Sequence, residues 1–192
     1  HAEHLELALL LNPKIVFCEK PLCSDIATAK ELIELFENQR VHLVVNYSRR
    51  FDPSIISLKN VIDTGEFGEL RGISGWYNKG LLNNGSHMLD LLIYLLGDLS
   101  IKYVGDAYYD TNEEDPSHPL FLTTKHGIAI ALSCGNASDF SLFELDFIFS
   151  SARVKMLNGG RQWSLETTVD DATFLGYKNL GIAKPNKLFK IN

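Results

Sequence analysis

No stretch of the 192-residue sequence is apolar for long enough to cross a bilayer. A membrane-spanning helix needs about 20 consecutive apolar residues, whereas the longest runs here, LELALLLN and LDLLIYLLG, are short and carry charge. Cysteine is also scarce: the three cysteines, at positions 18, 23 and 134, are odd in number and lack CxxC spacing. A disulfide framework is therefore not indicated, and we expect a protein of the reducing cytoplasm that does not associate with membranes.

Positive charge is in deficit, with 18 Lys and Arg against 24 Asp and Glu and a net charge of −6. This balance argues against a general nucleic-acid binder, which would show a basic patch or stripe. The sequence contains no Walker, EF-hand or GxSxG motif, so three common phosphate, calcium and hydrolase sites are not indicated. His1 and His4 are spaced i,i+3 without a third ligand, and we expect no metal site.

What is present is an α/β pattern over residues 1–48 that begins in the middle of a repeat. Buried strands are expected at KIVF (14–17) and VHLVVNYS (41–48), because short continuous apolar runs are typical of parallel sheets. Helices are expected from Ala2 to Leu11 and over 26–38, the second capped by Ser24 or Asp25. Strand, helix and strand form a right-handed crossover unit. A doubly wound sheet seldom begins with a helix and two strands, so we expect its first strands to be missing from this sequence.

After RRFDP the pattern changes to α+β over residues 49–192. Short strands separated by the turns KHG and NGG predict an open, mostly antiparallel mixed sheet with a few helices. The acidic loop TNEEDPSHP, with Asp115 and His118, is interpreted as a solvated connection. The tail from Gly176 has little periodic signal, and we expect truncation there too. Helices are predicted over 54–63 and 85–96, and strands over 70–77, 101–109, 119–125, 128–135, 140–149, 152–157 and 161–167.

Glu19-Lys20-Pro21 is the first candidate for chemistry. In parallel α/β sheets, ligands bind outside the carboxyl ends of the strands, and this tripeptide follows a predicted strand. Burial can lower the pKa of a lysine enough for proton transfer, and Pro21 stiffens the turn. On spacing alone, a surface turn that happens to carry two charges is the simpler interpretation.

The second candidate is NNGSHMLD, residues 83–90. Asn84 or Ser86 can cap the helix, and Gly85 allows a tight turn or a close approach to a ligand. His87 then lies in the first turn, where the helix dipole disfavours its cationic form, and a neutral histidine is a competent general base. Asp90, at i+3, could orient the imidazole or simply improve the helix start. Equally, His87 could pack locally without a chemical role.

Taken together, VFCEKPL, VNYSRRFDP and NNGSHMLDLLIYLLG resemble the glucose–fructose oxidoreductase / inositol dehydrogenase (Gfo/Idh/MocA) family in order and spacing, from His1 to about Thr168. The resemblance implies a two-domain oxidoreductase that uses NAD or NADP. Residues 1–48 would be the C-terminal remnant of its Rossmann domain. Residues 49–192 would be the α+β substrate-binding and oligomerisation domain, which forms a dimer or tetramer through the antiparallel sheet.

The resemblance also implies roles for individual residues. Lys20 matches a lysine near the nicotinamide and the reacting carbon–oxygen bond, and His87 matches the catalytic histidine that takes or gives the hydroxyl proton. Glu19 and Pro21, with Lys20, match residues on the nicotinamide side of the pocket, and His1 matches a histidine that ends an earlier strand-loop. The predicted substrate-binding set consists of Lys20, Arg50, Asn83, His87 and Asp90. From the residues alone, Arg49 and Arg50 could equally clamp a phosphate or carboxylate or carry charge at a domain junction.

Two departures from the family pattern matter. The GxGxxG loop is missing, so the chain by itself should bind a dinucleotide poorly or not at all. Asn83 stands where many members have an aspartate, so the proton relay can differ. The NNGSHMLDLL form is similar to members of surface-polysaccharide or sugar-nucleotide pathways.

Three functions are therefore carried forward. The leading hypothesis is a parent enzyme that moves a hydride between nicotinamide and a hydroxyl or keto carbon of a sugar, sugar nucleotide or cyclitol. The alternative is a non-catalytic sugar- or nucleotide-binding sensor or regulatory protein on the same fold. The third is an inactive substrate domain joined to half a Rossmann sheet, with an exposed parallel sheet edge that favours self-association. Consumption of reduced nicotinamide separates the first from the other two.

Overall fold

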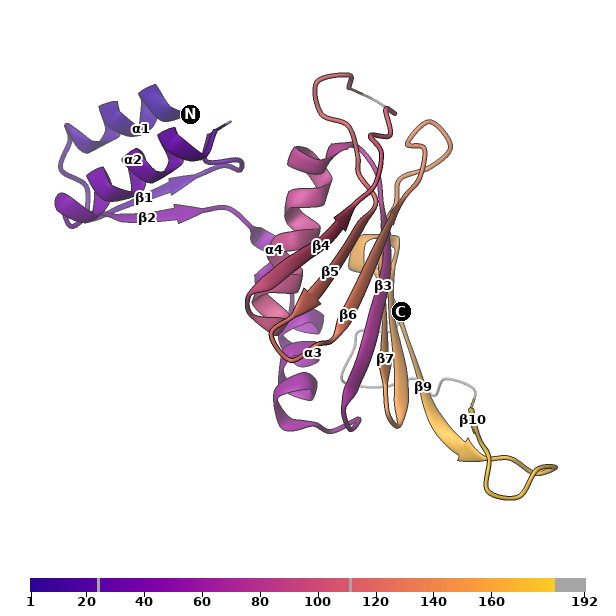
Figure 1. The fold of residues 1–192 in the computed structure, drawn as a ribbon. Coiled ribbons are helices and arrows are strands. Elements are labelled where there is room, and N and C mark those ends of the chain that lie inside the picture. Colours follow the sequence, from indigo (N-terminus) through magenta and orange to yellow (C-terminus); the bar gives the residue numbers. More distant parts are fainter. Residues whose placement is uncertain (24, 111, 182–192) are drawn as a thin grey trace. The chain divides into compact units, whose positions relative to one another are not determined.

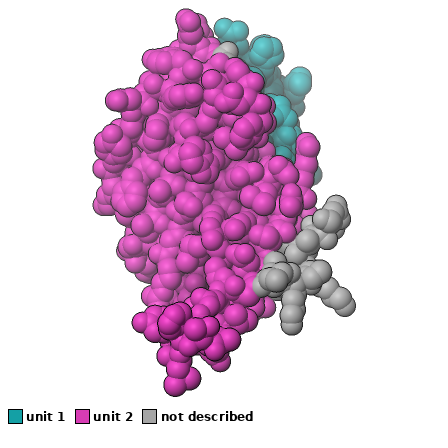
Figure 2. All heavy atoms as spheres, turned by 90° about the vertical axis from the view of Figure 1, so that its right-hand side faces the viewer, with its two compact units in different colours: residues 1–48 teal, residues 49–192 magenta. Residues whose placement is uncertain are grey.

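The computed structural model describes residues 1–23, 25–110 and 112–181, and the chain divides into two compact units, residues 1–48 and 49–192 (Figure 2). The first is called unit 1 below, and the second unit 2. Within the described residues, no helix combines the length and the apolar character that a membrane crossing requires.

Unit 1 is a two-stranded parallel sheet with helices α1 and α2 on one side (Figure 1). Asp25 caps α2 by accepting a hydrogen bond from the backbone N–H of Thr28 at 2.9 Å, as one of the two predicted caps; the other, Ser24, is outside the described residues. The predicted order of helix, strand, helix and strand is confirmed. The elements are α1 (Ala2–Leu9), β1 (Ile15–Cys18), α2 (Ile26–Asn38) and β2 (His42–Val45).

The predicted full burial of both strands in unit 1 is wrong. Cys18 is buried and Val16 packs beside it against the helices, but Ile15 and Phe17, which point to the other face of the sheet, are 58% and 63% exposed. Successive side chains of a strand point to opposite faces, and α1 and α2 cover only one of them. The apolar run therefore predicted the strand correctly, but not the number of covered faces.

Unit 2 is an open sheet in the order β10-β9-β8-β7-β3-β6-β5-β4, in which β3 and β6 are parallel and the other neighbours are antiparallel. This confirms the predicted mixed, mostly antiparallel sheet with few helices. Its helices are α3 (Pro53–Thr64), α4 (Ser86–Leu96), the π-helical turn η2 (Gly80–Gly85) and the 3-10 turns η1 (Ser48–Phe51) and η3 (Asn158–Gly160). Its strands are β3 (Leu70–Tyr77), β4 (Leu99–Val104), β5 (Leu120–Thr124), β6 (Ala129–Cys134), β7 (Phe143–Phe149), β8 (Ala152–Leu157), β9 (Gln162–Asp170) and β10 (Lys178–Leu180).

In unit 2, one predicted strand is shorter in the structure and one observed strand was not predicted. The strand expected over 101–109 ends at Val104, and the following loop returns through a single bridge between Tyr108 and Ser117. Strand β10 was not predicted, because its three residues are all exposed and carry no periodic signal. The expected second truncation concerns the end of the chain, where residues 182–192 lie outside the described part.

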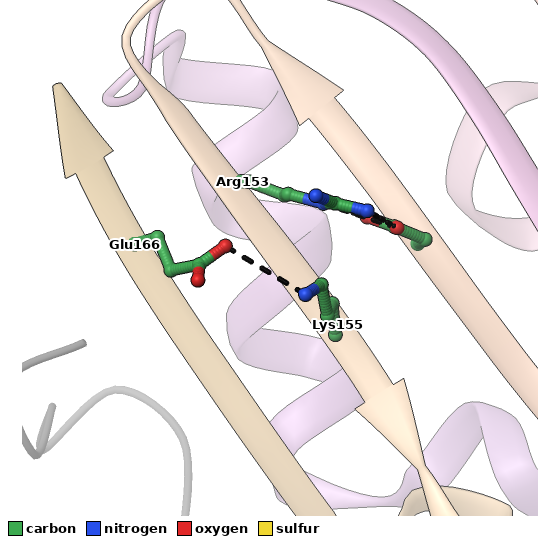
Figure 3. A network of polar contacts seen from close by, with 4 residues as sticks. Arg153, Lys155 and Glu166 are labelled. Carbon is green, nitrogen blue, oxygen red and sulfur yellow. Dashed lines mark hydrogen bonds and ion pairs between the residues drawn. The ribbon is translucent and has the colours of Figure 1, made fainter. Parts of the chain in front are cut away.

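The core of unit 2 lies between one face of the sheet and helices α3 and α4, as Figure 1 shows. Every second residue of β7 faces this core, and Phe147 is fully buried. The opposite face of the sheet is open and carries cross-strand ion pairs: Arg153 with Asp146, and Lys155 with Glu166 at 3.8 Å (Figure 3). The sheet thus has one apolar face covered by helices and one open face that carries charged pairs, as expected when helices cover only one side.

Candidate functional site

The Glu-Lys-Pro turn of unit 1 lies at the carboxyl end of β1. Asn46, which follows β2, donates its backbone N–H to the carbonyl of Cys18 at 2.8 Å and its side-chain amide to Glu19 Oε1 at 2.7 Å. Glu19 therefore ties together the ends of both parallel strands. Lys20 is half-buried, and the Lys20–Pro21 peptide bond is cis. The hydrogen bonds of Asn46 thus hold the turn at this edge of the sheet, a contact that the strand pattern alone could not establish.

His1 lies beside this turn. Its Nδ1 is 3.6 Å from the sulfur of Cys18, and both residues line a cavity of about 230 Å³ together with Glu19. Burial raises the pKa of the Cys18 thiol. A thiol with a raised pKa stays protonated near neutral pH and is a weak nucleophile, so Cys18 supports the turn by packing rather than by covalent chemistry.

The helix that carries His87 begins earlier than predicted. The π-helical turn η2 runs directly into α4, so the helical segment starts at Gly80. Neither Asn84 nor Ser86 caps it: the Asn84 amide donates to the carbonyl of Leu142 at 3.1 Å, and the Ser86 hydroxyl donates to the carbonyl of Asn83 at 3.0 Å. The predicted effect of the dipole on His87 therefore does not apply, because that effect falls off within the first turn.

Gly85 has a different role from the predicted tight turn. Its φ of −60° is ordinary helical backbone, but a Cβ atom at this position would lie 2.9 Å from both Tyr77 Cε2 and Leu81 Cδ1. The glycine is required because the π-helical turn packs against the Tyr77 ring. The close approach at Gly85 is to the protein's own core, and the predicted close approach to a ligand stays untested.

The acidic loop supplies the true cap of this helical segment. Asp115 accepts the backbone N–H groups of Leu82 and Asn83 at 2.8 and 2.9 Å. In the same loop, Ser117 is fully buried and its hydroxyl accepts the N–H of Gly80 at 3.0 Å. A carboxylate at a helix start satisfies the open N–H groups and opposes the positive end of the dipole. The interpretation of Asp115 as a solvated residue was wrong.

His118, also expected to face solvent, is half-buried. Its Nδ1 lies 3.0 Å from the carbonyl of Gly105, and its backbone N–H donates to the Tyr77 hydroxyl at 2.9 Å. That hydroxyl in turn donates to the His118 carbonyl at 2.7 Å. Burial raises the pKa of Tyr77 far above its usual range. The loop is therefore bound to β3 as well as to the helix start.

Asp90 pairs with Arg50. The Arg50 Nε donates to one carboxylate oxygen at 2.8 Å, and its Nη2 donates to the other. Asp90 is 9% exposed and lies on the first turns of α4, whereas Arg50 comes from the RRF segment before α3. Of the alternatives left open by the sequence, Arg50 clamps a carboxylate, but that carboxylate belongs to the protein itself. The pair joins the RRF and HMLD segments within unit 2.

His87 and Asn83 lie one turn apart on the same helical segment. Asn83 is exposed, while His87 is half-buried and its Nδ1 atom is buried. Lys20 belongs to unit 1 and His87 to unit 2, so their joint action on one substrate stays a prediction.

The structure adds one feature that the sequence did not predict. A cavity of about 640 Å³ in unit 2 is lined by Arg49, Lys79 and Arg161, together with polar side chains that include Asn84. The three cations lie far apart in the sequence, on η1, before η2 and after η3. No spacing rule could have grouped them.

Comparisons with known proteins identify the family to which the fold and these motifs belong. Residues 1–47 match the model of the family described as "Oxidoreductase family, NAD-binding Rossmann fold" (GFO_IDH_MocA). An inositol 2-dehydrogenase of Salmonella paratyphi B is 40% identical over an alignment of 148 residues, and the match covers 69% of this chain and 44% of that protein. One from Mycolicibacterium smegmatis is 44% identical over 64 residues, 33% of this chain and 19% of that protein.

Solved structures share the fold across nearly the whole chain. An inositol dehydrogenase homologue from Azotobacter vinelandii, complexed with NADH and myo-inositol, has a TM-score of 0.72 at 18% identity. The match covers 96% of this chain and 55% of the homologue's chain. The 3-ketoreductase KijD10 from Actinomadura kijaniata, complexed with TDP-benzene and NADP, has a TM-score of 0.70 at 21% identity. The match covers 95% of this chain and 61% of the KijD10 chain. The chain belongs to the Gfo/Idh/MocA family. It spans less than half the length of the two curated relatives named above.

Proposed function

We propose that the protein that contains this sequence is an NAD- or NADP-dependent oxidoreductase. It would transfer a hydride between nicotinamide and a hydroxyl or keto carbon of a sugar, sugar nucleotide or cyclitol. The observation that carries the proposal is the Glu19–Asn46 bond, which fixes the Glu-Lys-Pro turn at the carboxyl edge of a parallel strand pair. The family match over residues 1–47 and the nicotinamide ligands of solved neighbours support it.

The residues of unit 1 fit the nicotinamide end of such a cofactor. Ligands of parallel sheets bind outside the carboxyl ends of strands, and Glu19, Lys20 and Pro21 lie there. A Gly-rich loop for the pyrophosphate is absent from the sequence, so unit 1 offers only part of a dinucleotide site. Bound nicotinamide would accept or donate the hydride, and the protein supplies position and electric field.

In the proposed oxidation, His87 takes the proton of the substrate hydroxyl and Lys20 stabilises the oxygen as negative charge develops. The Arg50–Asp90 pair fixes the first turns of α4 and so holds the His87 backbone in place. Asp115 anchors the preceding turn. Asn83 contributes no charge. The proposed proton transfer therefore depends on His87 as the base and on Lys20 as the charge that stabilises the oxygen.

The open face of the unit 2 sheet is the proposed surface for a homodimer or homotetramer. It combines the charged pairs of β7, β8 and β9 (Figure 3) with apolar side chains that are unusually exposed for strands, namely Trp76 at 48%, Phe121 at 41% and Ile148 at 39%. Apolar side chains gathered on one open face are typical of protein interfaces. Light scattering of the native protein and of a Trp76→Lys variant would test this assignment.

We also propose a cytoplasmic protein with a role in polysaccharide or sugar-nucleotide metabolism. The compartment is supported by three cysteines that are free thiols, and the pathway only by the sequence form of residues 83–92.

The experiment uses a version in which a dinucleotide-binding segment from a full-length relative precedes His1. Absorbance of reduced nicotinamide is followed with a panel of keto-sugars, sugar nucleotides and cyclitols. Lys20→Ala should lower turnover about 100-fold or more, the typical contribution of a positioned acid–base group, while circular dichroism stays unchanged. Lys14→Ala, an exposed lysine on the same unit, is the matched control. Equal turnover of the native protein and Lys20→Ala would contradict the proposal.

A sensor on the same fold is the second candidate, and Asn83 favours it, because an amide cannot replace a carboxylate in a proton relay. Binding of cofactor and sugar without any consumption of reduced nicotinamide would support the sensor.

A further inference from the structure

The cationic cavity of unit 2 has an unbalanced charge. Of the described residues that line it, three are cations, Arg49, Lys79 and Arg161, and none is acidic. Carboxylates outside the lining are present: Asp110 accepts the N–H of Lys79 at 2.9 Å, Glu144 accepts the N–H of Asn158 at 3.3 Å, and Asp52 acts electrostatically on Arg49. Positive side chains gathered without neutralising partners in the lining favour an anionic ligand.

Arg49 is held in place within this cavity. Its guanidinium carbon lies 3.8 Å from the centre of the Phe143 ring, and its Nη1 donates to the carbonyl of Gly159 at 2.8 Å. Burial lowers the pKa of Arg49, but an arginine remains charged at neutral pH. Guanidinium carries five N–H donors, so this one bond leaves others for a ligand. A fixed guanidinium binds an oxyanion with little loss of side-chain freedom.

The backbone on both sides of the cavity takes left-handed conformations. Lys79 has a φ of 68°, and Asn158, Gly159 and Gly160 have φ values of 50°, 69° and 90°. A lysine rarely adopts this conformation, and the bond from its N–H to Asp110 holds it there. Such strain gathers at binding sites, where the surrounding structure enforces it. The tight η3 turn also presents the Gly159 carbonyl to Arg49.

We propose that this cavity binds the oxyanion of a charged carbohydrate, a phosphate or a carboxylate group. The inference rests on the proposed function. It narrows the proposed substrates, a sugar, sugar nucleotide or cyclitol, to those that carry an anionic group. Asn84 lines the cavity and lies three residues before His87 on the same helical segment. A ligand anchored here by its anionic group would therefore extend its hydroxyl groups along the helix that carries the proposed base.

The test measures binding and needs no dinucleotide. The 192-residue chain is titrated at low salt, by isotope-edited NMR, with glucose 6-phosphate, glucuronate and glucose as probes. At least one of the two anions should bind about tenfold or more tightly than glucose, as expected for charge-assisted hydrogen bonds, and added NaCl should weaken it. The anion that binds identifies the group as phosphate or carboxylate.

Arg161 is the residue to change first, because it is exposed and its loss should not disturb the core. Arg161→Gln should weaken the bound anion about tenfold, Arg161→Lys should restore much of the affinity, and Lys125→Gln, an exposed lysine on the β5–β6 turn, should leave it unchanged. The inference is overturned if neither anion binds more tightly than glucose, or if Arg161→Gln and Lys125→Gln weaken binding equally. This experiment measures only ligand binding. Its outcome is therefore independent of whether the nicotinamide assay detects turnover.

Discussion

The two units differ in how completely their strands are buried. Among the described residues of unit 2, Phe147 of β7 lies fully inside a cluster of 23 buried apolar residues. In unit 1, Phe17 of β1 is 63% exposed, and the buried cluster has six members among the residues that the structure describes. Burial of a large side chain stabilises a fold by about 1.5–3 kcal/mol, so unit 2 has several times the hydrophobic stabilisation of unit 1. The same kind of apolar strand thus has a different energetic role in each unit.

The strongest test of this comparison substitutes the two phenylalanines. Phe147→Ala should lower the free energy of unfolding of unit 2 by about 3–5 kcal/mol, because it leaves a cavity in a closed core. Phe17→Ala should change that of unit 1 by no more than about 0.5 kcal/mol, as for surface sites. Hydrogen exchange followed by mass spectrometry, read at the amides of β7 and β1, measures both. A large loss of protection in Phe17→Ala would show that the open face of β1 is covered in solution.

A second test asks whether unit 2 also depends on its buried polar contacts. Asp90→Asn should cost roughly 1–3 kcal/mol, less than the removal of a fully buried ion-pair partner, because the Arg50 side chain is 38% exposed and partly screened by water. Asp63→Asn, which breaks the exposed pair with Lys59 on α3, should cost about 0.5 kcal/mol or less. Urea denaturation followed by fluorescence of Trp76 and Trp163 reports on unit 2 alone. Similar costs for both variants would contradict the assigned role of Asp90.

The acidic loop offers a third test, of the cap on the η2–α4 segment. Asp115→Ala should destabilise unit 2 by about 1 kcal/mol, the usual cost of a lost cap. Glu113→Ala, two residues away and exposed, is the control and should have almost no effect on the melting temperature. If both variants melt alike, the loop contributes to stability through its backbone and not through the Asp115 carboxylate.

The smallest expected effect concerns pH and unit 1. Side-chain and backbone hydrogen bonds from Thr28 hold the pKa of Asp25 below its usual value. A depressed pKa means that the contribution to stability is present above the unfolded value of about 3.9 and is lost as the pH falls through the lower folded value. Protection of the α2 amides should therefore decline in acid in the native chain, and Asp25→Ala should remove this part of the pH dependence. An unchanged acid profile in the variant would rule out Asp25 as its source.

Local patterns carried most of the element prediction. Apolar spacing and the Asp25 cap marked helix α2, and the turns KHG and NGG separated the strands of unit 2. These signals lie within a few residues of the element they define, so they can be read without tertiary structure. Strand β10 was missed because it has no apolar period.

The candidate site was predictable in part. The motifs that include Lys20 and His87 were found from their spacing, and the family assignment was confirmed. The partner of Asp90 could not be found this way, because Arg50 lies 40 residues earlier. The cap from Asp115 is 32 residues from Asn83, and an acidic loop ordinarily indicates solvent. The predicted roles of Lys20 and His87 in catalysis stay predictions.

By itself, the sequence determined the order of the elements, the two-part pattern and the family, because these depend on side chains close together along the chain. The tertiary structure decided which face of β1 is covered, which cation pairs with Asp90, and that Arg49, Lys79 and Arg161 line one cavity. These outcomes depend on how distant segments pack. Local periodicity sets which way a side chain points from its element, and only packing determines what it meets there.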